Sequence, residues 1–362
     1  MRSMSDIVLI GGGVIGLSIA YELATRGASV RVLDQGQLGR ESSWAGAGMI
    51  TPANPDRAPS PEFRLRGESF VRWPEWAARL SEETGIDTGF ARCGGIEIAA
   101  ETSALASKLQ TEGVRAERLD SRELRKLEPN LNPEFSEAVH LPDYCQVRNP
   151  RLLKALLAAC AARGVELSPG MPVIGFQQQA GRVTAVRTPA EVISAAQFVA
   201  CSGAWSQAVL AQAGCQISVV PVHGQIVLLD MLPLPTRRII EVGSRYIVPR
   251  ADGHLLVGST EEWVGFDKRN TAEAVAELIR FGCELIPSLK SARLERCWSG
   301  LRPGSPNGLP YLGRIPHTDN LFVAAGHFRA GLMLSPITAV LLRQQLLGET
   351  PALSIDHFAV PC

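Results

Sequence analysis

The start of the chain alternates apolar runs with glycine. Residues 7–10 are all apolar, which is typical of a strand buried on both faces of a parallel sheet. Glycines follow, and over 14–26 the apolar residues recur at helical spacing, with Gly27 as a candidate C-cap. A second strand is predicted over 29–33 and ends at Asp34. The pattern therefore predicts a β-strand, helix, β-strand unit over residues 7–34.

Later segments predict further helices and strands. A long amphipathic helix is predicted over 62–84, and Pro74 is expected to kink or split it. A short helix over 121–127 has Asp120 as its N-cap, and another over 149–163 has Asn149 as N-cap with Pro150 in its first position. The remaining predicted helices span 271–285 and 331–347, and the predicted strands span 95–99, 173–176, 183–187, 198–201, 219–229, 245–249, 255–258 and 321–325.

The order of these elements predicts two interleaved domains. Nucleotide-binding patterns lie at both ends and in the middle of the chain, with antiparallel strand patterns between them. We therefore expect an α/β fold in which a Rossmann-like domain (1–90, 147–222 and 297–362) is interleaved with an α+β domain built on a large antiparallel sheet (91–146 and 223–296).

Composition and charge exclude several classes of protein. Lys+Arg and Asp+Glu are both 36, so the chain lacks the basic surplus typical of proteins that bind nucleic acid or anionic membranes. An apolar fraction of 46% predicts a soluble globular protein. The apolar stretch 7–20 is not expected to be a signal peptide, because it contains four glycines and no convincing cleavage site follows it. It is also shorter than the about 20 apolar residues that a membrane span needs.

The eight cysteines, at positions 93, 145, 160, 201, 215, 283, 297 and 362, form no CxxC pair and no metal-ligand spacing with a histidine. We expect reduced thiols, a cytoplasmic protein and no metal site.

The glycines after the first strand carry the most specific motif. Gly11, Gly13 and Gly16 form G-x-G-x-x-G between a predicted strand and a predicted helix. These glycines allow a tight turn, the approach of a pyrophosphate and close packing of the helix, and Asp34 can accept hydrogen bonds from a ribose hydroxyl. A tight turn without a ligand is the alternative. The motif alone does not separate NAD from FAD.

Other small-residue runs also close predicted strands or lie near them. The most specific are SWAGAGM at 43–49, YIVPR at 246–250, GLRPG at 300–304 and GHFRAG at 326–331. On these residues the chain resembles the D-amino-acid oxidase-like FAD-dependent flavoproteins, and within them the glycine oxidases of bacterial thiazole biosynthesis. The resemblance covers essentially the whole chain.

The resemblance implies an FAD-binding domain of the glutathione-reductase type and a homo-oligomer, often a tetramer. Related sarcosine oxidases carry a flavin-linking cysteine in the stretch equivalent to 302–314, which has none here, so FAD is expected to be noncovalent. Val173, in the predicted strand 172–176, would contact the adenine. The residues expected to bind the cofactor are Gly11, Gly13, Val14, Ile15, Gly16, Asp34, Gln35, Ser42, Ser43, Ala47, Gly48, Met49, Val173, Ser202, Gly203, His327, Phe328, Arg329, Ala330, Gly331, Leu332 and Met333.

The resemblance also implies a substrate site. Arg302 lies in a predicted proline-containing turn, and its planar guanidinium would bind a carboxylate through two parallel hydrogen bonds. Tyr246 would bind the same carboxylate. Arg329 would either close the site or balance the charge of the flavin, and Met49 would limit its size. No side chain is needed as a general base, and His327 is interpreted as structural or flavin-facing.

The implied reaction is the oxidation of glycine, sarcosine or D-alanine by O2 and water, through hydride transfer to flavin. Its products are the 2-oxo acid, ammonia and hydrogen peroxide, or an imine supplied to a thiazole-synthesis partner. Ser244 and Glu261 depart from some relatives and leave the ranking of substrates open. The alternatives are a dehydrogenase of the same fold with another electron acceptor, a non-catalytic flavin-binding subunit and an NAD-dependent dehydrogenase, which would leave the C-terminal loop at 326–331 unexplained.

Overall fold

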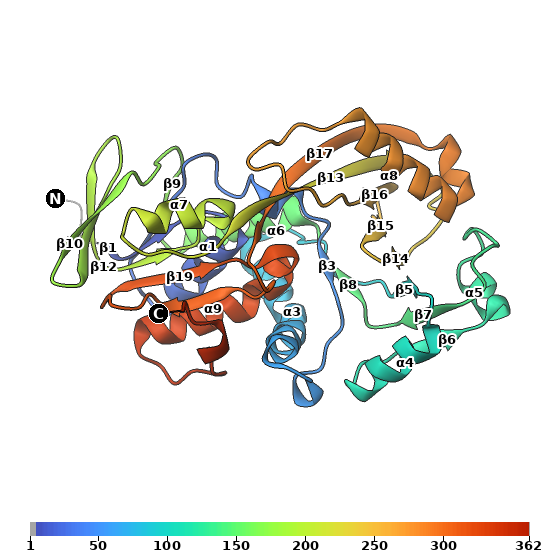
Figure 1. The fold of residues 1–362 in the computed structure, drawn as a ribbon, viewed down its shortest axis with the longest axis horizontal. Helices are drawn as coiled ribbons and strands as arrows, with labels where there is room; N and C mark the ends of the chain where they lie inside the picture. Colours follow the sequence, from blue (N-terminus) through green and yellow to red (C-terminus); the bar gives the residue numbers. More distant parts are fainter. Residues whose placement is uncertain (1–4, 362) are drawn as a thin grey trace.

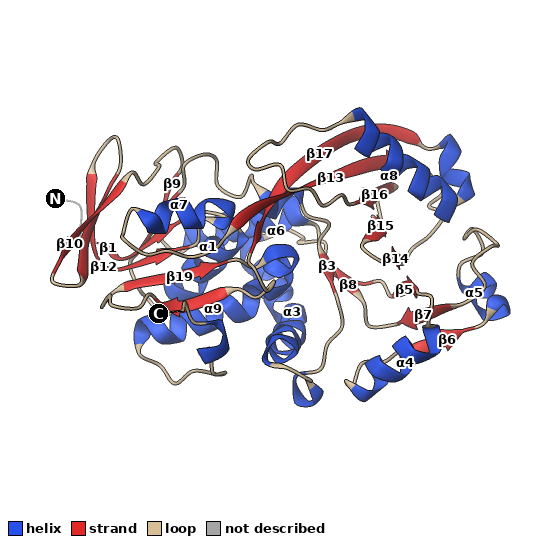
Figure 2. Ribbon diagram, viewed as in Figure 1, coloured by secondary structure: helices blue, strands red, loops and turns tan. Residues whose placement is uncertain are grey.

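The computed structural model describes residues 5–361 as two eight-stranded sheets joined by a small three-stranded one (Figure 1). Cys362 and the outer predicted domain limits at 1 and 362 lie outside the described residues. The two large sheets confirm the predicted α/β fold class. Figure 2 shows that most of the helical structure lies around the first sheet.

The first sheet has a parallel centre, a parallel edge strand at β9 and antiparallel strands beyond β12 and β19. Its order is β10-β11-β12-β1-β2-β9, and β19 and β18 extend it from β12. Its strands are β1 (Ser5–Ile10), β2 (Val30–Leu33), β9 (Glu166–Ser168), β10 (Gly175–Gln179), β11 (Arg182–Arg187), β12 (Val192–Ala200), β18 (Tyr311–Arg314) and β19 (Leu321–Ala325). Parallel strands with helices on the sheet faces bury apolar side chains on both sides, which is why β1, β2 and β19 are apolar runs.

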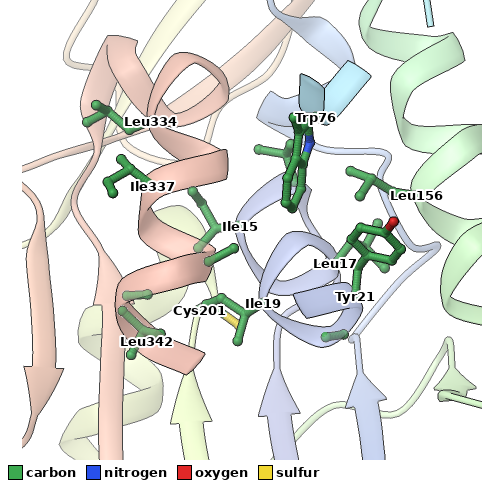
Figure 3. Packing of buried hydrophobic residues seen from close by; sticks show 14 of the residues in the cluster. Ile15, Leu17, Ile19, Tyr21, Trp76, Leu156, Cys201, Leu334, Ile337 and Leu342 are labelled. Atoms are coloured by element: carbon green, nitrogen blue, oxygen red, sulfur yellow. The ribbon is translucent and has the colours of Figure 1, made fainter. Parts of the chain in front are cut away.

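One face of this sheet is covered by four helices. These are α1 (Val14–Ala24), α3 (Pro61–Thr84), α6 (Asn149–Ala162) and α9 (Gly331–Leu347). Figure 3 shows α1 in the middle, with Ile15 directed towards Leu334 and Ile337 of α9, and Tyr21 near Leu156. The other face packs against a smaller core that includes α7 (Ser206–Ala211).

The second sheet is antiparallel except where β14 meets β5. Its order is β17-β13-β16-β15-β14-β5-β7-β6. Its strands are β5 (Gly95–Ile98), β6 (Glu117–Leu119), β7 (Ala138–Leu141), β13 (Val220–Asp230), β14 (Ile239–Val242), β15 (Arg245–Pro249), β16 (His254–Gly258) and β17 (Arg293–Gly304). One face packs on α8 (Ala272–Leu285), and the other faces the loop that contains Ala47 and Met49.

Short elements complete the fold. They are β3 (Met49–Ile50), β4 (Ala91–Arg92), β8 (Cys145–Gln146), α2 (Ser42–Ala45), α4 (Thr102–Thr111), α5 (Ser121–Leu127), η1 (Pro55–Arg57), η2 (Gly203–Trp205), η3 (Pro287–Ser291), η4 (Phe328–Ala330) and η5 (Asp356–Phe358). The predicted bounds of α5, β15, β19 and α9 are confirmed, as is the N-cap Asp120, which accepts hydrogen bonds from two backbone amides.

Several local predictions are wrong. Of the two effects expected of Pro74, a split of α3 does not occur, because the helix continues through this residue. The C-cap of α1 is Thr25 and not Gly27. Asn149 is not an N-cap: it is the first residue of α6 after the cap residue Arg148, and Pro150 is the second. The strand predicted over 173–176 begins only at Gly175, so Val173 lies just before it. Arg302 lies in strand β17 and not in a turn.

The domain limits stay a prediction. The limits at 222/223 and 296/297 fall inside β13 and β17, which are paired strands of the second sheet.

The cysteines and the most apolar helix fit a compact core. The seven cysteines in the described part of the chain are free thiols. One helical segment, 328–347, is long and apolar enough to cross a membrane, but 72% of its apolar window is buried within the protein. It therefore has the character of a core helix, as its packing against α1 shows in Figure 3.

Candidate active site

A cavity of about 410 Å³ extends from the end of β1 to the second sheet. Its lining contains every residue that the sequence analysis assigned to cofactor or substrate except Gly16. Gly16 lies just behind the wall, where an added Cβ would be 2.0 Å from the Gly11 carbonyl oxygen. Assigned residues from eight separate stretches of sequence are therefore brought together around one space.

The glycine-rich turn forms one end of this cavity. Gly11 has φ +118, and an added Cβ would lie 2.3 Å from the carbonyl oxygen of Cys201, so only glycine fits without strain. The turn leads directly into α1, whose N-terminal Val14 amide donates to Ser43 Oγ at 2.9 Å. The N-terminus of α1 thus faces the cavity, where its dipole favours a phosphate.

Asp34 ends β2 on the same wall. Its Oδ2 accepts a hydrogen bond from the Gly12 amide at 2.7 Å, and its Oδ1 accepts one from the Gly36 amide at 2.8 Å. These bonds fix the carboxylate beside the glycine-rich turn. The position is the one expected for an acceptor of ribose hydroxyl hydrogen bonds.

The second glycine-rich loop is held from behind by Arg250. This buried guanidinium donates to the Ala47 carbonyl at 2.7 Å, the Val147 carbonyl at 3.1 Å and Gln146 Oε1 at 2.6 Å. Burial lowers the pKa of Arg250 to about 10. Arg250 closes the characteristic run at 246–250, but its sequence context alone indicates no role for it.

Arg302 and Tyr246 reach the cavity from different strands of the second sheet. The Nη2 of Arg302 donates to Ser259 Oγ at 2.7 Å and its Nη1 donates to the Thr260 carbonyl at 3.1 Å. Burial lowers the pKa of Arg302, and among the described residues no carboxylate forms an ion pair with it. A half-buried cation that contacts only neutral oxygens is suited to an anionic ligand.

Two glycines make room for these side chains. A Cβ at Gly224 would lie 2.2 Å from Arg302 Nη1, and one at Gly258 would lie 2.6 Å from the Tyr246 hydroxyl. Both side chains therefore lie flat over neighbouring strands, and their polar ends approach the region around Ser259.

Arg329 and His327 have defined partners. Arg329 Nε donates to Glu261 Oε2 at 2.9 Å, so this arginine already has a carboxylate partner at the exposed edge of the cavity. His327 is 2% exposed, and its Nε2 lies 3.2 Å from Thr338 Oγ1. Burial lowers the pKa of His327 to about 3, so the ring is neutral at physiological pH.

The cavity wall also contains polar residues that the sequence analysis did not assign. Among them are Thr51, Arg66, Tyr144 and Glu241. Each lies in a segment without a recognisable motif, so only the register of the strands and the packing of the loops bring them here.

The family model for FAD dependent oxidoreductases matches residues 6–345. The chain belongs to this family. The glycine oxidase of Pseudomonas putida is 39% identical over 361 residues, 98% of each chain. The bifunctional protein ThiO/ThiG of Synechocystis sp. is 34% identical over 365 residues, which are 99% of this chain and 54% of that protein. The crystal structure of glycine oxidase from Geobacillus kaustophilus superposes with a TM-score of 0.94 at 32% identity, over 99% of this chain and 98% of that one.

The cavity of this FAD-dependent oxidoreductase fits the family's cofactor. The turn at Gly11, which a Cβ would fill, and the α1 N-terminus would hold the pyrophosphate, and Asp34 would hold the ribose. The loop at 46–49 and the segment 327–333 line the same cavity as Arg302 and would hold the ring system. Among the described residues no group of three side chains could hold a metal ion.

We expect the purified oxidoreductase to be yellow and to release its FAD on heat or acid. Cys201 is the cysteine on the cavity wall, and its Sγ contacts the Gly11 carbonyl oxygen at 3.2 Å. Burial raises the pKa of this thiol far above neutrality, so it stays protonated and unreactive. Acid precipitation followed by absorbance spectra of pellet and supernatant is the measurement. Flavin that remains on the polypeptide would contradict noncovalent binding.

Proposed function

We propose that the protein oxidises glycine and small amines such as sarcosine and D-alanine. The observation that carries this proposal is the pair Arg302 and Tyr246, which face the cavity and have no carboxylate partner within residues 5–361. The similarity to glycine oxidases at 39% and 36% identity supports the same substrate class.

In this proposal the protein binds and orients the substrate. Arg302 forms two parallel hydrogen bonds with the substrate carboxylate, and the Tyr246 hydroxyl donates a third. FAD supplies the acceptor for the hydride that leaves the α-carbon. The neutral ring of His327 has no role as a base, and the buried walls around the α-carbon exclude water.

The wider reaction follows from the same proposal. With FAD bound, O2 would accept the two electrons and be reduced to hydrogen peroxide, and water would hydrolyse the imine to glyoxylate, or to the corresponding 2-oxo acid, and ammonia. The ThiO/ThiG relatives support transfer of the imine to a thiazole-synthesis partner instead. We further propose a cytoplasmic homotetramer, on the free cysteines and the family resemblance.

Anaerobic addition of glycine to the purified protein tests the proposal. Glycine should bleach the yellow colour within the dead time of manual mixing or shortly after. If it does not, the proposal is wrong. Admission of air, with a peroxide assay set against dye reduction, then separates an oxidase from a dehydrogenase that uses another electron acceptor.

The size of the substrate gives a further prediction. Met49 and Tyr246 both line the cavity, and we propose that they narrow it around the α-carbon, so that a slender chain is accepted more readily than an aromatic ring. Glycine, sarcosine and D-alanine should therefore have a higher kcat/KM than D-phenylalanine and D-tryptophan, as measured by anaerobic flavin reduction. A bulky aromatic D-amino acid that outperforms glycine would show that the pocket is wider than proposed.

A further inference from the structure

A carboxylate lies on the cavity face of the second sheet, beside the proposed substrate residues. Glu241 belongs to β14, and its directly opposed residue in β15 is Tyr246. Opposed residues of neighbouring antiparallel strands point their side chains to the same face, with Cβ atoms about 5 Å apart. Both residues line the cavity, so Glu241 faces the same space as the carboxylate-binding pair.

The surroundings of Glu241 contain no cation in contact with it. Its Oε2 accepts a hydrogen bond from the Tyr144 hydroxyl at 2.9 Å, and within residues 5–361 it forms no ion pair. The opposed residue on its other side, in β5, is a second carboxylate, Glu97. The positive charge that acts on it is Arg329, which is paired with Glu261.

These neighbours set the protonation of the carboxyl group. Burial raises the pKa of Glu241 to about 7, and the charge of Glu97 raises it as well. The hydrogen bond from Tyr144 and the charge of Arg329 act in the opposite direction. Burial has removed the water that would stabilise the negative charge of this carboxylate, and no cation replaces that water. A cationic ligand would therefore stabilise the charged form of the carboxylate.

The neighbouring wall is polar as well. The Tyr144 hydroxyl also lies 3.4 Å from Thr51 Oγ1, and both residues line the cavity. Ser244, in the turn between β14 and β15, lines it too. This part of the cavity therefore offers several hydrogen-bond acceptors around one negative charge.

We propose that Glu241 and the Tyr144 hydroxyl form a second subsite, which binds the cationic group of an α-amino acid that carries a second amine. The inference rests on the proposed function, since it assumes that Arg302 and Tyr246 bind the carboxylate of the same molecule. The subsite selects among substrates by charge, whereas Met49 and Tyr246 select by size.

Pairs of substrates that differ by one charge test the subsite. D-ornithine is compared with D-norleucine, and N-(2-aminoethyl)glycine with N-propylglycine, because in each pair an ammonium replaces a methyl group. The measurement is kcat/KM for flavin reduction in anaerobic stopped flow at pH 8. We expect the cationic member of at least one pair to be favoured by about ten- to a hundredfold, the usual value of a hydrogen bond to a charged group. Glu241→Gln should abolish this preference.

Glu97→Gln is the matched control. Glu97 is the adjacent carboxylate in the same row of the sheet, but it does not line the cavity, so its loss should keep the preference. The pH dependence then identifies the titrating group. The preference should weaken as the pH falls through about 7, because Glu241 becomes protonated. Glu97→Gln should move this loss to lower pH, and Tyr144→Phe should move it to higher pH.

Two failures have different meanings. If glycine does not reduce the flavin of the wild-type protein, the proposed function is wrong. If glycine reduces it but neither pair shows a charge preference, or if Glu241→Gln keeps the preference, only the subsite is wrong.

Discussion

Arg302→Ala should lower kcat/KM for glycine at least about thirtyfold. Removing one partner of a buried charge pair costs about 2–5 kcal/mol, because the remaining charge is left unpaired, and about 1.4 kcal/mol corresponds to a factor of ten. The guanidinium is held by Ser259 and Thr260 and not by the cofactor-binding turn. Flavin content should therefore stay near normal. Anaerobic flavin reduction at several glycine concentrations is the measurement.

Two further variants separate charge from position. Arg302→Lys should recover only part of the loss, because one ammonium cannot make two parallel bonds. Gly224→Ala keeps the arginine but places a Cβ 2.2 Å from its Nη1, so it should also impair glycine oxidation. An amine substrate without a carboxylate should be affected far less by all three changes. Wild-type kinetics for Arg302→Ala, or loss of flavin from it, would contradict the assignment.

Gly11→Ala should weaken the binding of FAD. The positive φ of this residue costs an L-residue about 1–3 kcal/mol, and the added Cβ would meet the Cys201 carbonyl oxygen at 2.3 Å. The turn must then move away from the geometry that presents the α1 N-terminus to the cavity. We expect FAD affinity to fall at least about tenfold, as measured by titration of the apoprotein with FAD.

Gly27→Ala is the control for backbone strain. Gly27 follows the other end of α1, has φ +79 and would have no atom within 4 Å of an added Cβ. It carries the strain of positive φ without the clash, so its FAD affinity should stay near that of the wild type. Equal loss in both variants would mean that destabilisation of α1, and not the shape of the turn, governs binding.

Local sequence signals predicted the elements whose structure depends on local contacts. The strand, glycine turn and helix at the start of the chain, and α5 with its capping residue Asp120, need only near neighbours. β17 was missed because RLERCWSGLRPG has neither alternation nor a continuous apolar run. It is an edge strand ordered by pairing with β13, and Pro303 is tolerated at an edge.

In the candidate site, too, residues in local motifs were predicted and residues placed by long-range strand pairing were not. Gly11, Asp34 and Arg302 lie in runs with recognisable spacing, and all of them reach the cavity. Glu241 lies in the short run IIEV, where one polar residue has no distinguishing pattern. Its position beside Tyr246 is set by the register of β14 on β15. Similarly, Pro74 did not split α3 because Trp73 and Trp76 bury that helix in the core.

The absence of a side chain at Gly224 has a consequence for protein engineering. Arg302 lies flat because the opposite strand contributes no Cβ, so the arginine and the glycine form one functional unit. Libraries that randomise position 302 alone sample only residues that can pack over a glycine at position 224. Libraries that vary 224 and 302 together can replace the guanidinium by a new surface built from both strands, which is the shorter evolutionary route to amines without a carboxylate.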